Sequence, residues 1–176
     1  MPAILREDFL NFLQNPTRDS YIRLADQMAN SPDYDPYSNE LRALEHLIET
    51  QQFAEVMKQI PEVMARWVLN PRIHMIGSMA ASRMGDETTA KMEGMIALGC
   101  LRGIEATGDG TREQPFVVCY TADEYDLMMS KDKEAKGQML VDEGGKPYDV
   151  MRFEDGSEMW FDISRPYSVM QRRKET

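Results

Sequence analysis

Residues 79–90 read Met-Ala-Ala-Ser-Arg-Met-Gly-Asp-Glu-Thr-Thr-Ala, and this stretch decides the fold of the first hundred residues. Apolar and small residues at helical spacing lead up to Gly85, which suits the left-handed position after a helix. Asp86 completes the turn, and a second helix begins at about Glu87 with Ala90 in its first turns. Small side chains let paired helices approach closely, so the stretch predicts two packed helices joined by a tight turn.

The pattern recurs along the chain at a fixed offset. Phe53 and Glu87 begin equivalent helices, and 87 − 53 is 34; Val56 and Ala90 obey the same offset. Pro61 lies inside one helix and predicts a bend there. Apolar stripes with a period near 3.6 residues predict six helices, at about residues 7–13, 17–28, 39–50, 53–70, 71–84 and 87–104.

A period of 34 residues is that of the tetratricopeptide repeat (TPR), and residues 5–105 resemble such an array. The match departs from the TPR pattern at several positions. Glu40 and His74 stand where the first helix of each unit usually has an aromatic residue, and Leu44 stands where the first unit would have a glycine. The resemblance implies a superhelix whose inner groove is lined by the first helix of each pair. The candidate binding residues on that inner face, which could equally be a solvated face, are Arg42, His46, His74 and Ser78.

The turn at residues 107–111, Thr-Gly-Asp-Gly-Thr, marks the predicted boundary between a helical region (1–105) and a small α/β module (106–176). Beyond it, alternating residues predict a mainly antiparallel sheet, so the fold class is α+β. Thr121 and Glu124 have the spacing of a capping box that opens one short helix. Strands are expected at 114–120, 138–141, 148–153 and 158–163, and a frayed polar terminus at 171–174.

As a whole, the chain resembles a bacterial family of unknown function in which TPR-like helices precede a small module. The shared features are a Gly-Asp-Gly-Thr turn, a Pro-Phe-Val-Val strand, a Tyr-Asp-Val strand and a closing Phe-Asp-Ile-Ser-Arg-Pro segment. In this chain they are residues 108–111, 115–118, 148–150 and 161–166. The resemblance implies the architecture, with the module packed on or capping the helices, and implies no activity.

Charge limits the kinds of partner. The net charge is −10 and the pI about 4.7, so nucleic acid and anionic membranes are not expected partners. A basic protein or peptide would be favoured, although plain soluble proteins are often acidic too. No run of about 18 apolar residues predicts a transmembrane helix, and the first eight residues lack a signal-peptide core. We therefore expect a cytoplasmic protein, although a chain whose signal peptide had been removed would look the same.

No set of residues with catalytic or metal-binding spacing stands out. His46 and His74 have no second ligand nearby, and no Cys-x-x-Cys occurs. The Gly-x-Gly at 108–110 follows a helix and lacks the lysine of a phosphate loop. Cys100 and Cys119 have no neighbouring base and are expected to be buried and free, a single bridge being the alternative. No catalytic residue, metal or cofactor is therefore expected.

Fifteen methionines is a high number, and methionine-rich surfaces bind varied partners. Their positions on apolar stripes nevertheless favour core filling for Met57, Met64, Met84, Met92 and Met95.

Three functions fit the sequence. The first is an interaction or adaptor protein without catalysis that binds a protein or peptide segment. The second is a bacterial immunity-type protein that neutralises a basic toxin, which the small size and acidic charge favour. The third is an enzyme with a pocket in the C-terminal module, whose candidate residues are Tyr148, Asp162 and Arg165.

Overall fold

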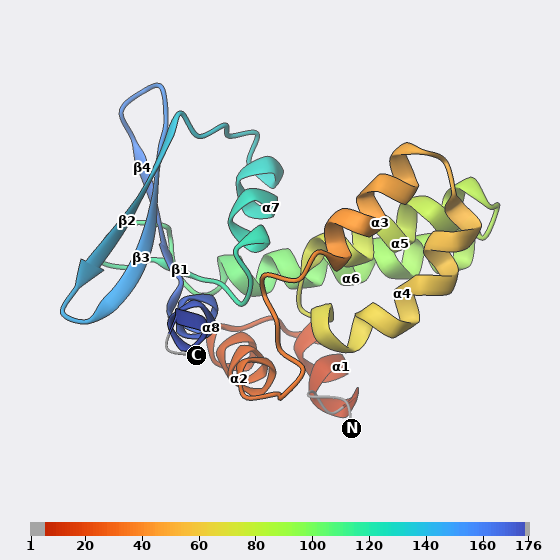
Figure 1. The fold of residues 1–176 in the computed structure, drawn as a ribbon, viewed down its shortest axis with the longest axis horizontal. Helices are drawn as coiled ribbons and strands as arrows, with labels where there is room; N and C mark the ends of the chain where they lie inside the picture. Colours follow the sequence, from red (N-terminus) through yellow and green to blue (C-terminus); the bar gives the residue numbers. More distant parts are fainter. Residues whose placement is uncertain (1–5, 175–176) are drawn as a thin grey trace.

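The computed structural model describes residues 6–174 and shows an α+β fold. In that part of the chain, six helices come first, and a four-stranded mixed sheet with two more helices follows (Figure 1). The helical region comprises α1 (Arg6–Gln14), α2 (Arg18–Ala29), α3 (Glu40–Glu49), α4 (Phe53–Trp67), α5 (Pro71–Arg83) and α6 (Glu87–Glu105). The rest comprises β1 (Phe116–Val117), α7 (Ala122–Ser130), β2 (Gly137–Glu143), β3 (Lys146–Arg152), β4 (Glu158–Asp162) and α8 (Ser164–Lys174). The ends of the two predicted regions, 1–5 and 175–176, lie outside the described residues.

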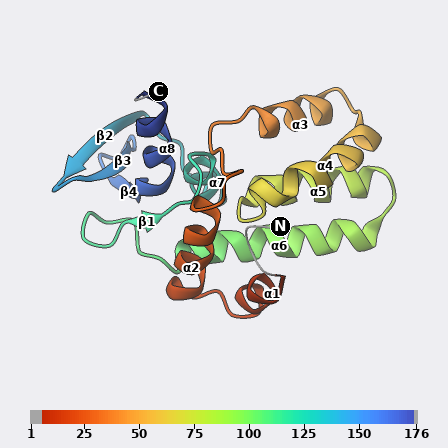
Figure 2. The ribbon, with the colours of Figure 1, turned by 60° about the horizontal axis from the view of Figure 1, so that its bottom comes forward.

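The six helices agree with the predicted bounds to within three residues. Helix α5 lies between α4 and α6, while α3 packs on α4 and α5 (Figure 2). Side-chain caps fix the starts of two of these helices. The Asn70 side chain accepts a hydrogen bond from the Ile73 N–H at the start of α5, and Asp86 caps α6 in the same way. Gly85 has φ +82° between α5 and α6, as its sequence position predicts. Helix α4 continues through Pro61.

Helix α6 is crossed closely by α1 and α2 at two of its glycines. A Cβ atom added to Gly103 would lie 2.5 Å from the Phe12 ring and 2.8 Å from the Tyr21 ring. One added to Gly99 would lie 2.6 Å from the Leu13 side chain. The lack of a side chain at Gly99 and Gly103 therefore permits the close approach of α1 and α2 to α6.

The sheet has the strand order β1-β4-β3-β2. The pairs β2–β3 and β3–β4 are antiparallel, whereas β1 runs parallel to β4, so the sheet is mixed. The predicted strand at 114–120 shortens to two residues because the chain after it turns into the core. There the Cys119 and Tyr120 N–H groups each donate to Asp123 Oδ2 at 2.9 Å instead of to a neighbouring strand.

Helix α7 begins without the predicted capping box. Thr121 has helical backbone angles (φ −63°, ψ −26°) and makes no side-chain cap, and Glu124 is buried. The Asp123 carboxylate instead fixes the turn that leads into the helix, because it accepts from the Cys119 and Tyr120 N–H groups, which precede the helix. The spacing of Thr121 and Glu124 therefore predicted the wrong side chains for the start of this helix.

Residues 171–174, predicted to be a frayed terminus, form the last turn of the regular helix α8. Asp162 Oδ1 accepts from the Ser164 N–H at 3.0 Å, which fixes the first turn. Val169 is buried, and Arg165 pairs with Asp26 of α2 at 2.7 Å. Packing against α2 and the sheet orders this segment despite its polar composition.

One cluster of buried apolar side chains extends through both the helical region and the sheet region. At its centre the rings of Trp67 and Tyr120 stack with centroids 4.6 Å apart. The Tyr34 hydroxyl donates to the Cys119 carbonyl, which joins the loop before α3 to the segment after β1. Cys100 and Cys119 are both buried and unbridged, as the sequence predicted.

The methionine prediction is only partly confirmed. Met57 and Met64 pack against the core, whereas Met84, Met92 and Met95 are 53%, 52% and 74% exposed. The apolar stripe of α6 is wider than the surface that α1, α2 and α5 cover. Despite these exposed side chains, no helix within residues 6–174 combines the length and apolarity needed to cross a membrane.

Candidate functional site

Helix α7 joins the sheet region to the helical region through buried polar contacts. The Asn70 amide donates to Asp123 at 2.8 Å and to Asp126 at 3.2 Å. Arg72 donates to Asp126 at 2.7 Å and, through another nitrogen, to Glu45 at 2.9 Å. Because Asp123 and Asp126 are almost completely buried, these bonds hold α7 in a fixed position against α5.

Burial dominates the electrostatics of α7. It raises the pKa of Asp123 to about 7, although the Asn70 amide and two backbone N–H groups favour the charged form. Burial, followed by the nearby charge of Asp149, raises the pKa of Glu124 to about 9, so this carboxyl group is protonated at neutral pH. Within residues 6–174, no three His, Cys, Asp or Glu side chains are placed to hold a metal ion. The bonds to Asn70 and Arg72 make Asp123 and Asp126 part of the joint that positions α7.

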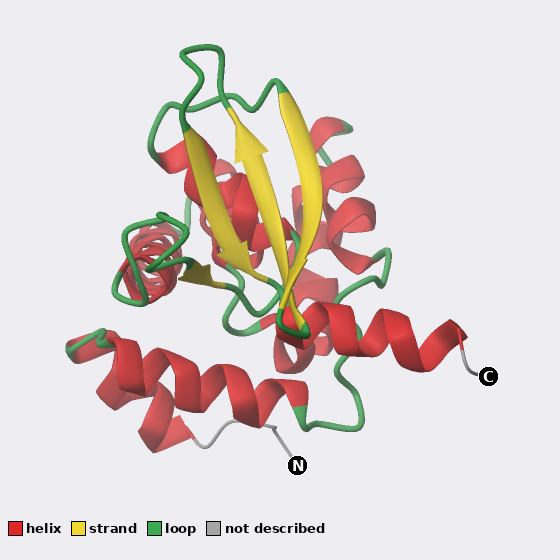
Figure 3. Ribbon diagram, turned by 90° about the vertical axis from the view of Figure 1, so that its left-hand side faces the viewer, coloured by secondary structure: helices red, strands yellow, loops and turns green. Residues whose placement is uncertain are grey.

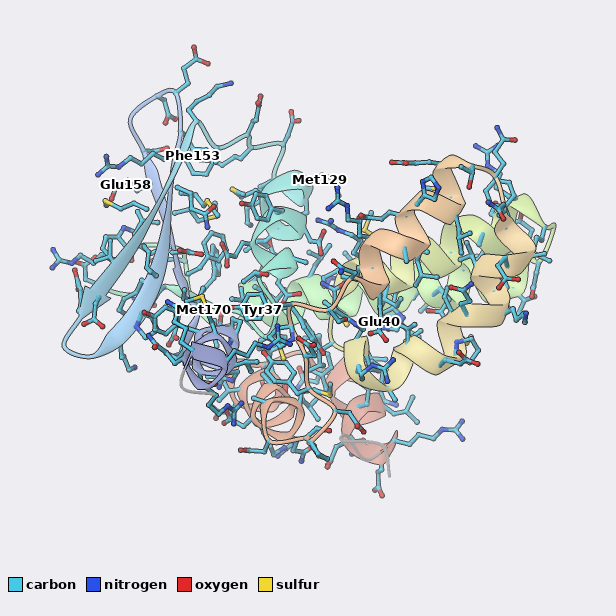
Figure 4. The ribbon with its side chains drawn as sticks, viewed as in Figure 1. Tyr37, Glu40, Met129, Phe153, Glu158 and Met170 are labelled. Atoms are coloured by element: carbon cyan, nitrogen blue, oxygen red, sulfur yellow. The ribbon has the colours of Figure 1, made fainter. Side chains whose placement is uncertain are left out.

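An open groove lies between α3, α5 and α7, and we call it the α3–α5 groove. It consists of two adjoining hollows that share Glu45 and Arg72. The first, about 540 Å³, is lined mainly by Tyr37, Leu41, Arg42, Trp67 and Tyr125. The second, about 480 Å³, is lined mainly by Ile48, Glu49, Met75, Ile76, Met79 and Met129. Figure 4 shows Met129 on the side of α7 that faces α3, and its side chain helps to line the second hollow.

The second hollow has an apolar floor and an acidic rim. Met75, Met79 and Met129 are 38%, 48% and 58% exposed, although all three are large apolar side chains. Glu45 already pairs with Arg72, whereas Glu49 is exposed and lies 3.9 Å from His46. This arrangement can hold apolar side chains against the methionines and a cationic group beside Glu49.

The four predicted binding residues separate into two groups. Arg42 lines the first hollow, and His46 lies exposed on α3 next to Glu49. His74 is 2% exposed and is held by Glu93 at 2.6 Å and by a backbone carbonyl, so it lies inside the fold. The Ser78 hydroxyl donates to the Ala90 carbonyl at 2.8 Å and joins α5 to α6.

Sequence reasoning missed Arg72, Met75 and Met79 as groove residues. The four-residue spacing of the two methionines was visible, but periodicity alone does not show which side of α5 stays open.

The residues considered for an enzyme lie near β4 and do not converge on one site. Tyr148 is paired with Asp162 across β3 and β4, and its ring packs edge-on against Trp160. Asp162 accepts from Ser164 at the start of α8, and Arg165 pairs with Asp26. Asp162 and Arg165 do line a common hollow of about 370 Å³, but Tyr148 is not part of its lining.

The fold and the site define an α+β protein in which paired helices and a small mixed sheet, joined by α7, leave an open groove on one side. The chain belongs to a family described as a domain of unknown function (DUF4919), whose model matches residues 17–172. No curated protein and no solved structure matches the chain.

Proposed function

We propose that this protein binds a short segment of another protein in the α3–α5 groove and has no catalytic role. The observation that carries the proposal is the set of exposed methionines, Met75, Met79 and Met129, which line one hollow. Contiguous exposed apolar side chains with a polar rim are typical of interaction sites. Methionine suits such a site because its flexible side chain adapts to different partner shapes.

The arrangement of the helices supports this use of the groove. Helices α3 and α5 begin successive helix pairs, and the first helix of each pair lines the inner groove in a TPR-like array. On this view the helical region is a short TPR-like stack, in which α7 closes one end and leaves the side along α3 and α5 open.

The chemistry of the groove favours a partner segment that combines apolar and basic residues. Glu49 offers a carboxylate at the rim, whereas the charge of Arg72 is offset by Asp126 and Glu45. The net charge of −10 adds a long-range attraction for a cationic segment. A hollow of about 480 Å³ lies within the usual size of sites that hold a few side chains.

Selection of peptides from a random displayed library on the immobilised full-length chain would test the proposal. We expect the selected peptides to contain apolar residues beside Lys or Arg, with affinities measured afterwards by fluorescence anisotropy of synthetic copies. Met79→Glu should weaken binding by about tenfold or more, because it places a charge on the apolar floor.

The matched control is Met92→Glu on α6, which has similar exposure (52% against 48%) but lies outside the groove. Binding that falls equally in both variants, or selected peptides without basic residues, would count against the proposed site.

A further inference from the structure

Strand β2 is one of the two edge strands of the sheet, and the longer of them. It pairs with β3 on one side, and no strand of the described chain pairs with its other side. Figure 3 shows the three long strands side by side in front of the helices. Alternate residues of this seven-residue strand therefore present unpaired N–H and C=O groups along one line.

The sequence of β2 carries its charges only at its end, at Asp142 and Glu143. Residues 137–143 read Gly-Gln-Met-Leu-Val-Asp-Glu, with no proline, no lysine and no arginine. Met139 and Leu140 are 39% and 52% exposed at the centre of the strand. Such an edge favours the addition of another strand.

We propose that two copies of this chain associate through antiparallel pairing of their β2 strands. A two-fold axis at Leu140 places this residue opposite its own copy and Met139 opposite Val141 of the other copy. Met139 and Val141 share a face with Val150 and Trp160, so the apolar row of that face continues across the axis. An interface of this kind is self-complementary, as two-fold symmetry requires.

The charges at the ends of β2 favour this antiparallel arrangement. Lys136 precedes the strand, while Asp142 and Glu143 close it. Antiparallel pairing brings Lys136 of each copy beside Glu143 of the other copy. Within each copy, Glu143 also pairs with Arg112 at 2.8 Å. Parallel pairing would instead place the acidic ends side by side, and like charges across a sheet are destabilising.

Sedimentation equilibrium of the full-length chain, over roughly micromolar to several hundred micromolar concentrations, tests the proposal. We expect a monomer–dimer equilibrium that is stronger at high salt, because salt screens the repulsion between two chains of net charge −10. Leu140→Glu should raise the dissociation constant about tenfold or more, since two carboxylates would then meet at the axis. Met139→Glu should act in the same direction from the opposite face of the strand.

The control is Met92→Glu, which changes the charge equally at the same 52% exposure on α6 and should leave the equilibrium unchanged. Thermal unfolding of each variant verifies that the fold is retained. A monomer at every concentration and salt would overturn the proposal, as would a dimer that Met92→Glu disrupts and both β2 variants leave intact. The groove proposal is unaffected by either result, since β2 contributes no residue to the α3–α5 groove.

Discussion

At the scale of single residues, Glu124 shows how α7 tolerates a cluster of acids. Its side chain is completely buried near Asp149 and Asp123, and burial with these charges raises its pKa from 4.5 to about 9. The Gln138 amide donates to Asp149 at 2.8 Å, so the charge of Asp149 is the better solvated of the two. Glu124 is therefore kept as a neutral acid, and the cost of holding its proton grows with pH.

We expect Glu124→Gln to make stability less dependent on pH. In the wild type the folded state holds the proton above pH 4.5 while the unfolded state loses it, so stability falls between pH 4.5 and about 9. The free energy of unfolding of the variant should equal that of the wild type at pH 4 and exceed it by a few kcal/mol at pH 9. Urea unfolding across this range measures the difference, with the exposed Glu154→Gln as control. Equal pH slopes for wild type and Glu124→Gln would contradict this account.

At the scale of elements, α6 depends on small residues where other helices cross it. Gly103→Ala should destabilise the protein by about 1–3 kcal/mol, because the new Cβ meets the Phe12 and Tyr21 rings below 3 Å. Gly94→Ala is the matched control in the same helix, since its nearest neighbour is the Ser78 hydroxyl at 3.4 Å. It should stabilise by up to about 1 kcal/mol through helix propensity. Thermal unfolding of both variants measures these changes in stability. Equal changes in the two variants would show that packing against the Phe12 and Tyr21 rings plays no part.

The six N-terminal helices could be predicted from the sequence because their apolar stripes and turn residues are local signals. The position of α7 was also predicted, but the side chain that fixes its start was not, because Asp123 is held by Asn70, which lies 53 residues earlier in the chain. Helix α8 was missed for a similar reason, since Arg165 and Arg173 pair with Asp26 and Asp35 far away in sequence. Order in both elements comes from tertiary contacts that no local pattern records.

The candidate site was predicted only in part, for the same physical reason. The expectation that α3 and α5 carry an exposed inner face led to Arg42, which lines the groove. It also led to His74, which the Glu93 carboxylate holds inside the fold. Whether a polar residue faces a groove or a neighbouring helix depends on how α5 is rotated against α6, and helical periodicity does not fix that rotation.

At the scale of the whole molecule, the helical and sheet regions depend on one another. Asn70 satisfies the buried Asp123 and Asp126, and the Tyr120 ring covers Trp67. Cutting the chain at the predicted boundary would expose these apolar surfaces and leave the polar groups without partners.

A fragment of residues 1–105 should therefore keep helical content but lose cooperative unfolding. Without Tyr120 and Asp123 the fragment exposes Trp67 and Asn70, so its helices lack the packing that fixes their side chains. Far- and near-ultraviolet circular dichroism with thermal unfolding checks this, using the full-length chain as control. Adding residues 106–176 in trans should restore part of the near-ultraviolet signal. A fragment that unfolds cooperatively within a few degrees of the full chain would show instead that the helical region is an independent domain.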